Sequence, residues 1–349
     1  MERKKRIGIL TGGGDCPGLN AAIRATAKTA IQMGYEVIGI RNGWRGFIDN
    51  KNKILDRDNT SGIIDRGGTI LGTSRWSPFQ IENGPRQVFD GFEKLGLEAL
   101  VVLGGEGTLS CTSRLFKTGL PVVGIPKTID NDVKETDYTI GFQTAVQIAT
   151  EALDRLRSIA ESHHRVMLLE VMGRYTGWIA TYAGMANGAD AILIPEIPLD
   201  KKKIEELCRM TEKRNQRGTA SSIVVVAEGT ELEGKTIGQH SFDLSKNEKT
   251  YRLGGIGNVI GEIIEKKTGI ETRVSSLDYI QRGGTPVAYD RTLATAFGVK
   301  AVELIRDRKY GEMTALKGNR ITSVPLDKVA DRIKTVNLNA YRIAKIFFG

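Results

Sequence analysis

The chain has 349 residues, of which 40% are hydrophobic and 26% charged. This composition is typical of globular proteins and excludes a disordered chain, and the length exceeds what one hydrophobic core usually organises, so we expect two domains. The formal charge of +9 would attract polyanions, but the cations are spread along the chain without a nucleic-acid-binding motif, so no nucleic-acid partner is expected.

The cysteines and the apolar runs bear on the expected cellular location of the protein. Cys16, Cys111 and Cys208 are few, odd in number and without CxxC spacing, which argues against a disulfide framework or a zinc site. A reducing, cytoplasmic location is therefore expected. No apolar segment approaches membrane-spanning length, so no membrane association is expected.

Strand, glycine-rich turn and helix recur in the first half of the chain. The apolar run Ile7–Leu10 predicts a buried strand, Thr11–Gly18 a turn with four glycines, and Leu19–Gln32 a helix. Further strands are predicted at Val37–Ile40, Leu100–Leu103 and Pro121–Ile125, with a helix that begins near Thr108.

The second half alternates in the same way. Strands are predicted at Val166–Glu170, Ile192–Ile194 and Ile223–Ala227, and helices at Phe142–Ser162, Asn258–Lys267, Arg291–Arg308 and Val329–Phe347. Such alternation indicates an α/β fold with mostly parallel sheets flanked by helices. Ligands of open α/β sheets bind beyond the carboxyl ends of the strands, which is where the glycine-rich and charged turns of this sequence fall.

Three of these turns carry chemistry suited to phosphates. Thr11–Gly18 exposes backbone amides ahead of a helix, because its glycines adopt angles that other residues avoid. Gly104–Thr108 adds the carboxylate of Glu106, an oxygen ligand for a phosphate-bound cation. Pro126–Asp132 combines a cation, a hydroxyl and two carboxylates. Each turn alone could be a solvated polar loop, but their recurrence at successive strand ends predicts a phosphate site.

Four motifs follow one another along the chain: Gly104–Thr108, Pro126–Asp132, Met172–Arg174 and Ile280–Gly284. With them the chain resembles the phosphofructokinase family over nearly its whole length. The resemblance implies a 6-phosphofructokinase of glycolysis, which moves the γ-phosphoryl of ATP to the 1-hydroxyl of fructose 6-phosphate. It also implies two sandwich-like domains, with donor binding by residues 1–141 and 281–331 and sugar-phosphate binding by 142–280 and 332–349.

The resemblance assigns the catalytic and donor-binding residues. Asp130 matches the family's general base, and a positioned carboxylate suits this role because a primary alcohol is a poor nucleophile at neutral pH. Arg75 and Lys127 would offset charge in phosphoryl transfer. Mg²⁺ would be held by Glu106 and Asp132, directly or through water; the family more often has Asp at position 106, and the longer Glu makes direct coordination less certain. Donor contacts are expected from Gly14, Arg75, Gly105, Glu106, Gly107 and Thr108.

The same resemblance assigns the acceptor site. It places Thr128, Ile129, Asp130, Arg165, Met172, Gly173, Arg174, Glu228, Arg273, Tyr279 and Arg282 around the sugar phosphate. The arginines suit the 6-phosphate because their planar fork binds two oxygens. Arg165 and Arg273 match residues that reach into a neighbouring subunit, which implies a homodimer or homotetramer with shared active sites. The family usually has Gly-His where this chain has Asp278-Tyr279, so a different acceptor is conceivable.

Two positions bear on the identity of the phosphoryl donor, and they favour different donors. Gly107 leaves room for the α-phosphate of ATP, whereas pyrophosphate-using relatives commonly carry Asp there. Lys127 often accompanies pyrophosphate use. Steric exclusion is nearly all-or-none, while one extra cation shifts a transition state by about a few kcal/mol. ATP is therefore the predicted donor, with pyrophosphate as the alternative.

Two other classes of function share some of these features. A kinase that phosphorylates NAD shares the glycine-glycine-acid-glycine-threonine turn, but the acceptor motifs argue against it. A catalytically silent basic protein that binds phosphates or nucleic acid is supported only by the net charge, and the intact Asp130 argues against it. An assay for fructose 1,6-bisphosphate separates all three.

Overall fold

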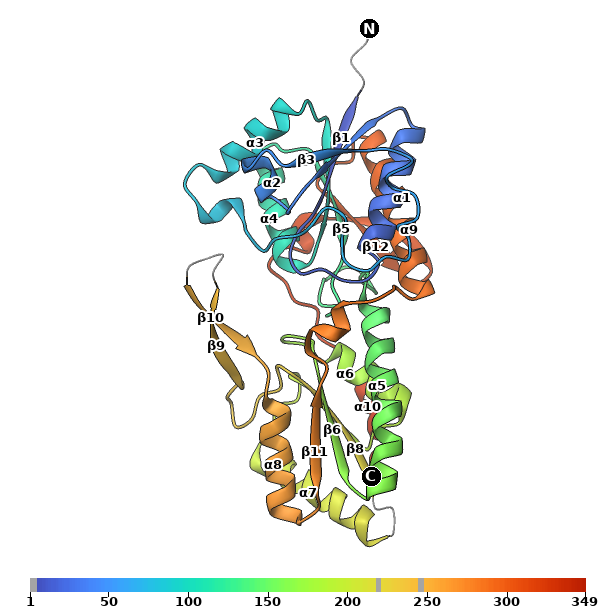
Figure 1. Ribbon diagram of the computed structural model, residues 1–349. Helices are drawn as coiled ribbons and strands as arrows, with labels where there is room; N and C mark the ends of the chain where they lie inside the picture. The colour runs from blue at the N-terminus through green and yellow to red at the C-terminus, as the bar shows by residue number, and fades with distance from the viewer. Residues whose placement is uncertain (1–4, 218–220, 244–247) are drawn as a thin grey trace. The chain divides into compact units, whose positions relative to one another are not determined.

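The computed structural model describes residues 5–217, 221–243 and 248–349 (Figure 1). The chain divides into two compact units, each built from two separate stretches of sequence. Unit 1 comprises Met1–Thr144 and Arg282–Lys334, and unit 2 comprises Ala145–Gln281 and Thr335–Gly349. Both units contain mostly parallel strands connected by helices, so the predicted α/β class is confirmed.

Unit 1 is organised around a seven-stranded sheet with the order β13-β12-β5-β4-β1-β2-β3. Only the β2–β3 and β12–β13 pairs are antiparallel. The central strands are nearly continuous apolar runs because they are buried on both faces. The strands are β1 (Arg6–Thr11), β2 (Glu36–Ile40), β3 (Asn52–Leu55), β4 (Ala99–Gly104), β5 (Val122–Pro126), β12 (Glu312–Lys317) and β13 (Arg320–Pro325).

Two helices of unit 1, α1 (Leu19–Gln32) and α9 (Ala288–Arg306), approach each other closely. The other helices of this unit are α2 (Arg45–Ile48), α3 (Gly84–Lys94) and α4 (Glu106–Lys117), with the short helices η1 (Pro78–Gln80) and η3 (Leu326–Lys328). A Cβ atom on Gly298 of α9 would lie 2.8 Å from the Cβ of Ala25 and 2.9 Å from the carbonyl oxygen of Ala22. Glycine therefore permits the close contact between α9 and α1.

A buried carboxylate fixes the start of the long helix α5 (Phe142–His163). Asp290 lies in the first turn of α9 and is fully buried. Its oxygens accept hydrogen bonds from the amides of Gly141 at 2.9 Å and Thr144 at 2.7 Å. These amides have no partner within the helix, so a side chain from elsewhere in unit 1 acts as the cap.

Unit 2 has an all-parallel four-stranded sheet with the order β11-β6-β8-β7. The strands are β6 (Val166–Val171), β7 (Ala191–Leu193), β8 (Ser222–Ala227) and β11 (Thr272–Ser276), beside the antiparallel hairpin of β9 (Gly238–Asp243) and β10 (Glu248–Leu253). Its helices are most of α5, α6 (Trp178–Asn187), α7 (Lys201–Gln216), α8 (Ile256–Thr268) and α10 (Leu338–Lys345), and η2 spans Asp278–Arg282. None of the helices in the described ranges is both long and apolar enough to cross a membrane.

The prediction of one helix over Val329–Phe347 is wrong in its first half. Helix α10 begins only at Leu338, where the side chain of Asn337 accepts a hydrogen bond from the amide of Asn339. Before it, Ile333 forms a bridge to Val133, and the amide of Lys334 donates to the carbonyl of Asp132 at 2.8 Å. This pairing with a distant turn holds the backbone extended, so tertiary contacts override local helix preference.

Candidate active site

Three predicted site turns begin at one edge of the unit 1 sheet. Strands β1, β4 and β5 are parallel neighbours, and they end at Thr11, Gly104 and Pro126. Strand β2 lies on one side of β1 and β4 on the other, so the strand order reverses beside β1. Such reversal points are where open α/β sheets bind ligands.

The glycine turn after β1 packs directly against the turn after β4. A Cβ atom on Gly12 would lie 2.7 Å from Cγ2 of Thr108, and one on Gly104 would lie 2.4 Å from its Cβ. Both distances are too short for a larger residue. The glycines therefore let the amides of one turn approach the start of helix α4, an arrangement suited to phosphate oxygens.

The segment that carries Arg75 is bonded to this glycine turn. The carbonyl of Ser74 accepts a hydrogen bond from the amide of Gly13 at 2.9 Å. The hydroxyl of Thr73 donates to the carbonyl of Gly13 at 2.7 Å. Arg75 follows directly and its side chain is exposed, which suits a cation that meets a bound phosphate.

Lys127 links the turn after β5 to the glycine turn. The lysine is 2% exposed, and its Nζ donates a hydrogen bond to the carbonyl of Gly14 at 2.6 Å. Burial lowers the pKa of Lys127 to about 8, and the neighbouring Arg282 adds to this effect while Cys16 opposes it. The ammonium is therefore charged at neutral pH but close to its titration point.

Arg282, predicted to bind the sugar 6-phosphate, lies against the same glycine turn. Its Nε donates to the carbonyl of Asp15 at 3.1 Å and is 3.8 Å from the Asp15 carboxylate. A Cβ atom on Gly14 would lie 1.6 Å from its guanidinium. In unit 1 this arginine therefore occupies the space that the missing side chain of Gly14 leaves.

The turn after β5 holds Asp130 and Asp132 nearly buried, at 8% and 7% exposure. Between them, Asn131 is fully buried and has a left-handed backbone with φ of 50°, a conformation that asparagine tolerates better than most residues. The hydroxyl of Thr128 accepts a hydrogen bond from the amide of Asp130 at 3.2 Å. Ile129, predicted among the sugar-binding residues, is fully buried and its side chain belongs to the core.

The predicted magnesium ligands follow neighbouring strands. Glu106 is the first residue of α4, and its Oε1 accepts a hydrogen bond from the hydroxyl of Ser110 at 2.8 Å. The described residues contain no group of three or more metal-ligating side chains. Mg²⁺ bound to phosphates usually takes one or two protein carboxylates, with phosphate and water oxygens completing its shell. Two carboxylates, such as those predicted at Glu106 and Asp132, are enough for an ion bound in this way.

A second group of predicted residues meets at the carboxyl edge of the unit 2 sheet. Glu228 follows β8, and its Oε1 accepts hydrogen bonds from the amide of Arg174 at 3.0 Å and that of Gly173 at 3.4 Å. Gly173 has a φ of 152° and Arg174 one of 51°. Glu228 thus fixes the Met172–Arg174 turn, which follows the adjacent strand β6.

Gln281 belongs to this group, although the sequence did not mark it as a site residue. It is fully buried, and its Oε1 accepts a hydrogen bond from the amide of Met172 at 2.7 Å. Its place inside the motif Ile280–Gly284 was the only available signal. Tyr279 of the same short helix is 53% exposed, so it can reach a ligand.

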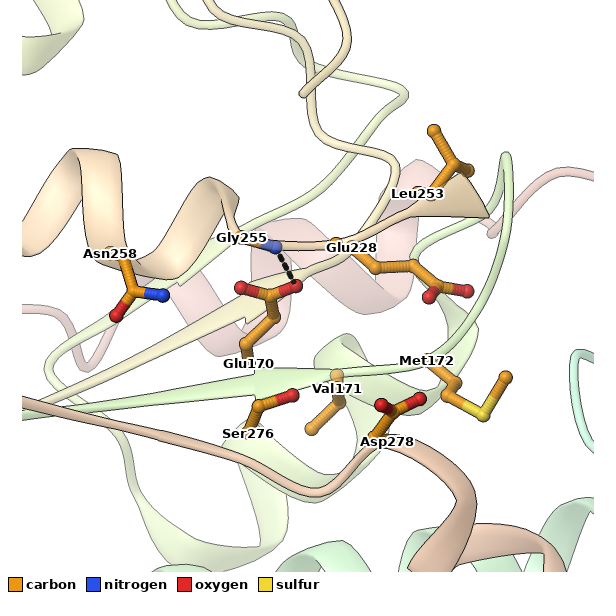
Figure 2. Close-up of a pocket in the computed structure, with 10 residues that line it drawn as sticks. Glu170, Val171, Met172, Glu228, Leu253, Gly255, Asn258, Ser276 and Asp278 are labelled. Atoms are coloured by element: carbon orange, nitrogen blue, oxygen red, sulfur yellow. Dashed lines mark hydrogen bonds between the residues drawn. The ribbon is translucent and has the colours of Figure 1, made fainter. Parts of the chain in front are cut away.

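A cavity of about 300 Å³ opens at this edge (Figure 2). Its wall includes the carboxylates of Glu170, Glu228 and Asp278. Glu170 accepts hydrogen bonds from the amides of Gly255 and Gly257, both at 2.8 Å, and so caps helix α8. Carboxylates accept hydrogen bonds and repel anions, so this wall suits sugar hydroxyls better than a phosphate.

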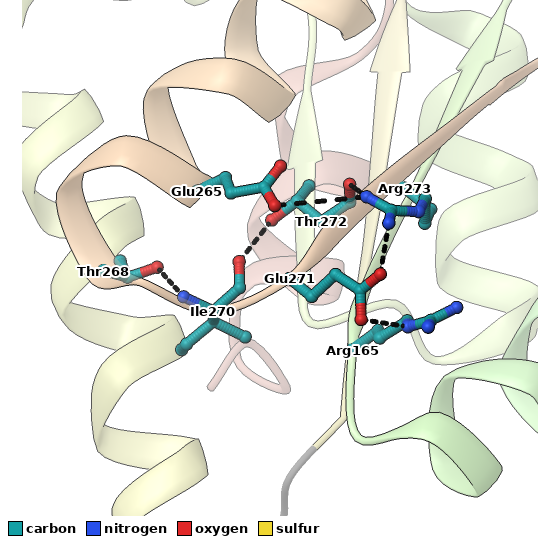
Figure 3. Close-up of polar contacts among 7 residues, drawn as sticks. All are labelled: Arg165, Glu265, Thr268, Ile270, Glu271, Thr272 and Arg273. Atoms are coloured by element: carbon teal, nitrogen blue, oxygen red, sulfur yellow. Dashed lines mark hydrogen bonds and ion pairs between the residues drawn. The ribbon is translucent and has the colours of Figure 1, made fainter.

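Arg165 and Arg273 lie at the opposite, amino edge of the same sheet (Figure 3). Both pair with Glu271, whose Oε2 is 2.6 Å from Nε of Arg165 and whose Oε1 contacts Arg273. Six residues of β6 separate this edge from the Met172–Arg174 turn, which is roughly 20 Å at about 3.3 Å per residue. Within one chain, these arginines therefore do not join Glu228.

Comparison with known proteins agrees with this geometry. The family model described as Phosphofructokinase matches residues 6–305. The chain is 47% identical over 348 residues to a pyrophosphate--fructose 6-phosphate 1-phosphotransferase of Streptomyces coelicolor, covering 99% of this chain and 100% of the relative. It is 48% identical over 335 residues to ATP-dependent 6-phosphofructokinase 3 of the same organism, covering 95% and 96%.

A solved structure of Pichia pastoris phosphofructokinase in the T-state superposes with a TM-score of 0.83 at 30% identity, over 99% of this chain and 37% of the longer fungal chain. The present chain thus spans less than half of that protein. Its relatives include users of both donors at nearly equal identity, so likeness alone does not select the donor. The motifs, the fold and these matches agree on one conclusion: the chain belongs to the phosphofructokinase family.

Proposed function

We propose that the protein is a 6-phosphofructokinase that transfers the γ-phosphoryl of ATP to the 1-hydroxyl of D-fructose 6-phosphate. The observation that carries this proposal is the turn after β5. It holds a buried lysine, Lys127, and two nearly buried aspartates beside the glycine turns of β1 and β4. A base, a cation and backbone amides are the groups that phosphoryl transfer to an alcohol requires.

Asp130 acts as the general base. It takes the proton of the attacking 1-hydroxyl as the new bond to phosphorus forms, and the bond from phosphorus to the donor's bridging oxygen breaks. A positioned base of this kind contributes about a hundred- to ten-thousandfold in rate. The limited exposure of Asp130, 8%, keeps bulk water from competing for this carboxylate.

The donor phosphates bind to the glycine turns of unit 1. Backbone amides near Gly14 and the Gly105–Thr108 turn receive their oxygens, and Arg75 and Lys127 balance the charge that develops during transfer. Mg²⁺, held by Glu106 and Asp132 directly or through water, offsets phosphate charge when it is bound. The hydroxyl of Ser110 holds the carboxylate of Glu106 in place.

The sugar binds at the carboxyl edge of unit 2. Glu228 and the Met172–Arg174 turn receive its hydroxyls, and Tyr279 contributes to the 6-phosphate. Arg165 and Arg273 serve the site of a second copy, because in their own chain they lie at the other edge of the sheet. The active enzyme is accordingly a homo-oligomer, a dimer or a tetramer.

ATP is the proposed donor because of the surroundings of Gly107. This residue is exposed, and a Cβ atom built on it meets no other atom within 4 Å. The open space can accept the nucleotide's α-phosphate. Pyrophosphate is the second candidate, favoured by the buried cation of Lys127 and by relatives such as the Streptomyces enzyme named for that donor.

A single assay tests both levels of the proposal. Purified protein is incubated with fructose 6-phosphate, Mg²⁺ and either ATP or pyrophosphate, and fructose 1,6-bisphosphate is measured through a coupled aldolase reaction. We expect kcat/KM to be higher with ATP. A tenfold preference for pyrophosphate would select the second candidate, and no product with either donor would refute the assignment.

A further inference from the structure

The turn that carries Asp130 and Asp132 is hydrogen-bonded to Lys334, the last residue of unit 1 in the sequence. The Nζ of Lys334 donates hydrogen bonds to Oδ1 of Asn131 at 3.1 Å, to the carbonyl of Thr136 at 2.8 Å and to that of Asp137 at 3.0 Å. A protonated lysine amine has three donors, and burial lowers the pKa of Lys334 to about 7 while Asp137 and Asp132 oppose that shift. The three acceptors lie in the turn and in the segment that directly follows it, although about two hundred residues separate Lys334 from Asn131.

The backbone of Lys334 holds the same turn a second time. Its amide donates to the carbonyl of Asp132 at 2.8 Å. The preceding residue, Ile333, forms an antiparallel bridge with Val133. Side-chain and main-chain contacts of one short segment therefore meet the turn at Asn131 and at Asp132, immediately beside Asp130.

Asn131 lies between the two aspartates in sequence and is held by further hydrogen bonds. Its Oδ1 also accepts a hydrogen bond from the amide of Thr139 at 3.1 Å, and its Nδ2 donates to the carbonyl of Asp137 at 3.2 Å. The side chain is fully buried and the backbone is left-handed. Because the direction of the chain at Asn131 sets where Asp130 and Asp132 point, a shift of this side chain displaces both carboxylates.

A nearby lysine shows what an ordinary surface contact with this turn looks like. Lys317 is 3.1 Å from the carboxylate of Glu135, and both side chains are partly exposed, at 47% and 37%. Such pairs contribute little to structure. Lys317 touches only a side chain at the rim of the turn, whereas Lys334 binds the backbone and the buried asparagine.

We propose that Lys334 is a positioning residue for phosphoryl transfer, whose ammonium fixes Asn131 and so aligns the carboxylates of Asp130 and Asp132 without touching a substrate. This inference rests on the proposed function. Misplacement of a reacting group by about 1 Å can cost about a hundredfold in rate. Loss of the ammonium should therefore lower turnover while the sugar-binding residues of unit 2 remain intact.

The test compares Lys334→Met with the matched control Lys317→Met in the full-length protein. Turnover and the KM for fructose 6-phosphate are measured with the preferred donor, and hydrogen–deuterium exchange is followed in peptides covering residues 128–141. We expect Lys334→Met to lower kcat about 10- to 100-fold with KM changed less than about threefold, and to speed exchange in this segment. Lys317→Met should match wild type in all three measurements.

Two further variants make the result specific. Lys334→Arg keeps the charge and several donors, so it should recover part of the lost turnover and slow the exchange again. Lys334→Gln keeps a polar tip without charge, and it replaces Lys334→Met if that variant does not fold. Its expected turnover lies above that of Lys334→Met but below about a third of wild type.

Several results would overturn the inference. Turnover of Lys334→Met or Lys334→Gln above about a third of wild type would do so, as would unchanged exchange over 128–141. An equal loss in Lys317→Met would show that any lysine near the turn has this effect. If the proposed function is wrong, the wild-type protein forms no fructose 1,6-bisphosphate. The comparison of hydrogen–deuterium exchange would still report whether Lys334 holds the turn.

Discussion

The carboxyl edges of the two sheets have the same origin but different chemistry. In unit 1, the turns after β1, β4 and β5 combine glycines and the carboxylates of Glu106, Asp130 and Asp132 with the buried cation of Lys127, and Arg282 lies against them. In unit 2, the wall of the cavity carries the carboxylates of Glu170, Glu228 and Asp278. Parallel strands supply an edge where side chains and amides converge, and the residues placed there decide whether that edge suits phosphates or sugar hydroxyls.

The two sheet edges show that the fold class of a unit does not by itself determine which chemical groups its site presents. The glycines of unit 1 expose backbone amides, so much of its anion-binding capacity comes from the main chain. In unit 2, Glu228 and Gln281 instead use their oxygens to fix the amides of the Met172–Arg174 turn. The first edge is therefore built to present donors, and the second is built to hold a loop of defined shape.

The largest expected effect comes from removing the base at the unit 1 edge. Asp130→Asn keeps the size of the side chain but cannot take the proton of the sugar hydroxyl. We expect turnover to fall by about two to four orders of magnitude with substrate affinities nearly unchanged. Steady-state kinetics and equilibrium binding of fructose 6-phosphate measure the two effects, and turnover above a tenth of wild type would remove Asp130 from this role.

The next effect tests whether the amino edge of unit 2 serves another copy. Arg273→Ala should raise the KM for fructose 6-phosphate about 10- to 100-fold, since a charge-assisted hydrogen bond to phosphate is lost. Lys266→Ala removes an exposed cation of α8 that pairs with Glu262 at 3.3 Å, and it should leave this KM unchanged.

Mixing variants makes the same point about shared sites more directly. Asp130→Asn subunits lack the base, and Arg273→Ala subunits lack a phosphate ligand. In a dimer, a hybrid of the two variants would contain one site with both residues intact and one site with neither. An equal mixture that re-pairs at random forms hybrids in about half of the dimers. It should therefore regain about a quarter of wild-type activity. Subunit exchange confirmed by native mass spectrometry without any recovery would mean that these arginines do not act between copies.

A smaller, selective effect is expected at Gly107. Gly107→Asp places a carboxylate in the open space beside the donor turn, so kcat/KM for ATP should fall about tenfold or more relative to that for pyrophosphate. Gly107→Ala adds only a methyl group and serves as the control. Equal losses with both donors in Gly107→Asp would show that the position does not discriminate between them.

The smallest predicted effect follows from the pKa of Lys127. Burial lowers this pKa to about 8, so the lysine is protonated below that value and loses its charge as the pH rises through it. When pyrophosphate is the donor, the leaving group is a strongly charged phosphate. Its departure depends more on this cation than the departure of the leaving group of ATP does. The ratio of kcat/KM for pyrophosphate to that for ATP should therefore fall several-fold between pH 7 and 9. Lys127→Arg stays charged, and its ratio should not change.

The sequence predicted those parts of the fold that have strong local signals. Strands β1, β4 and β5 were recognised because they are unbroken apolar runs followed by glycine or proline. The helix predicted over Val329–Phe347 was wrong because its first half pairs with residues 132–133. That pairing joins segments about two hundred residues apart, and no periodicity along the chain reports it.

The same limit applies to the site. The motifs identified Asp130 and Glu228, whose turns follow predicted strands, but nothing local marks Lys334 as a partner of Asn131 or Gln281 as a partner of Met172. The sequence also could not show that Glu271 pairs with both Arg165 and Arg273. Contacts between distant segments depend on the order of strands in the sheets, which emerges only in the folded chain.

The way each unit is assembled from the chain bears on its biosynthesis. All four strands of the unit 2 sheet lie in the continuous stretch from Val166 to Ser276. The sheet of unit 1 is begun by β1 but needs β12 and β13, which end at Pro325. On a translating ribosome the later-encoded sheet can thus close first, and the edge of β5 stays unpaired until β12 has emerged.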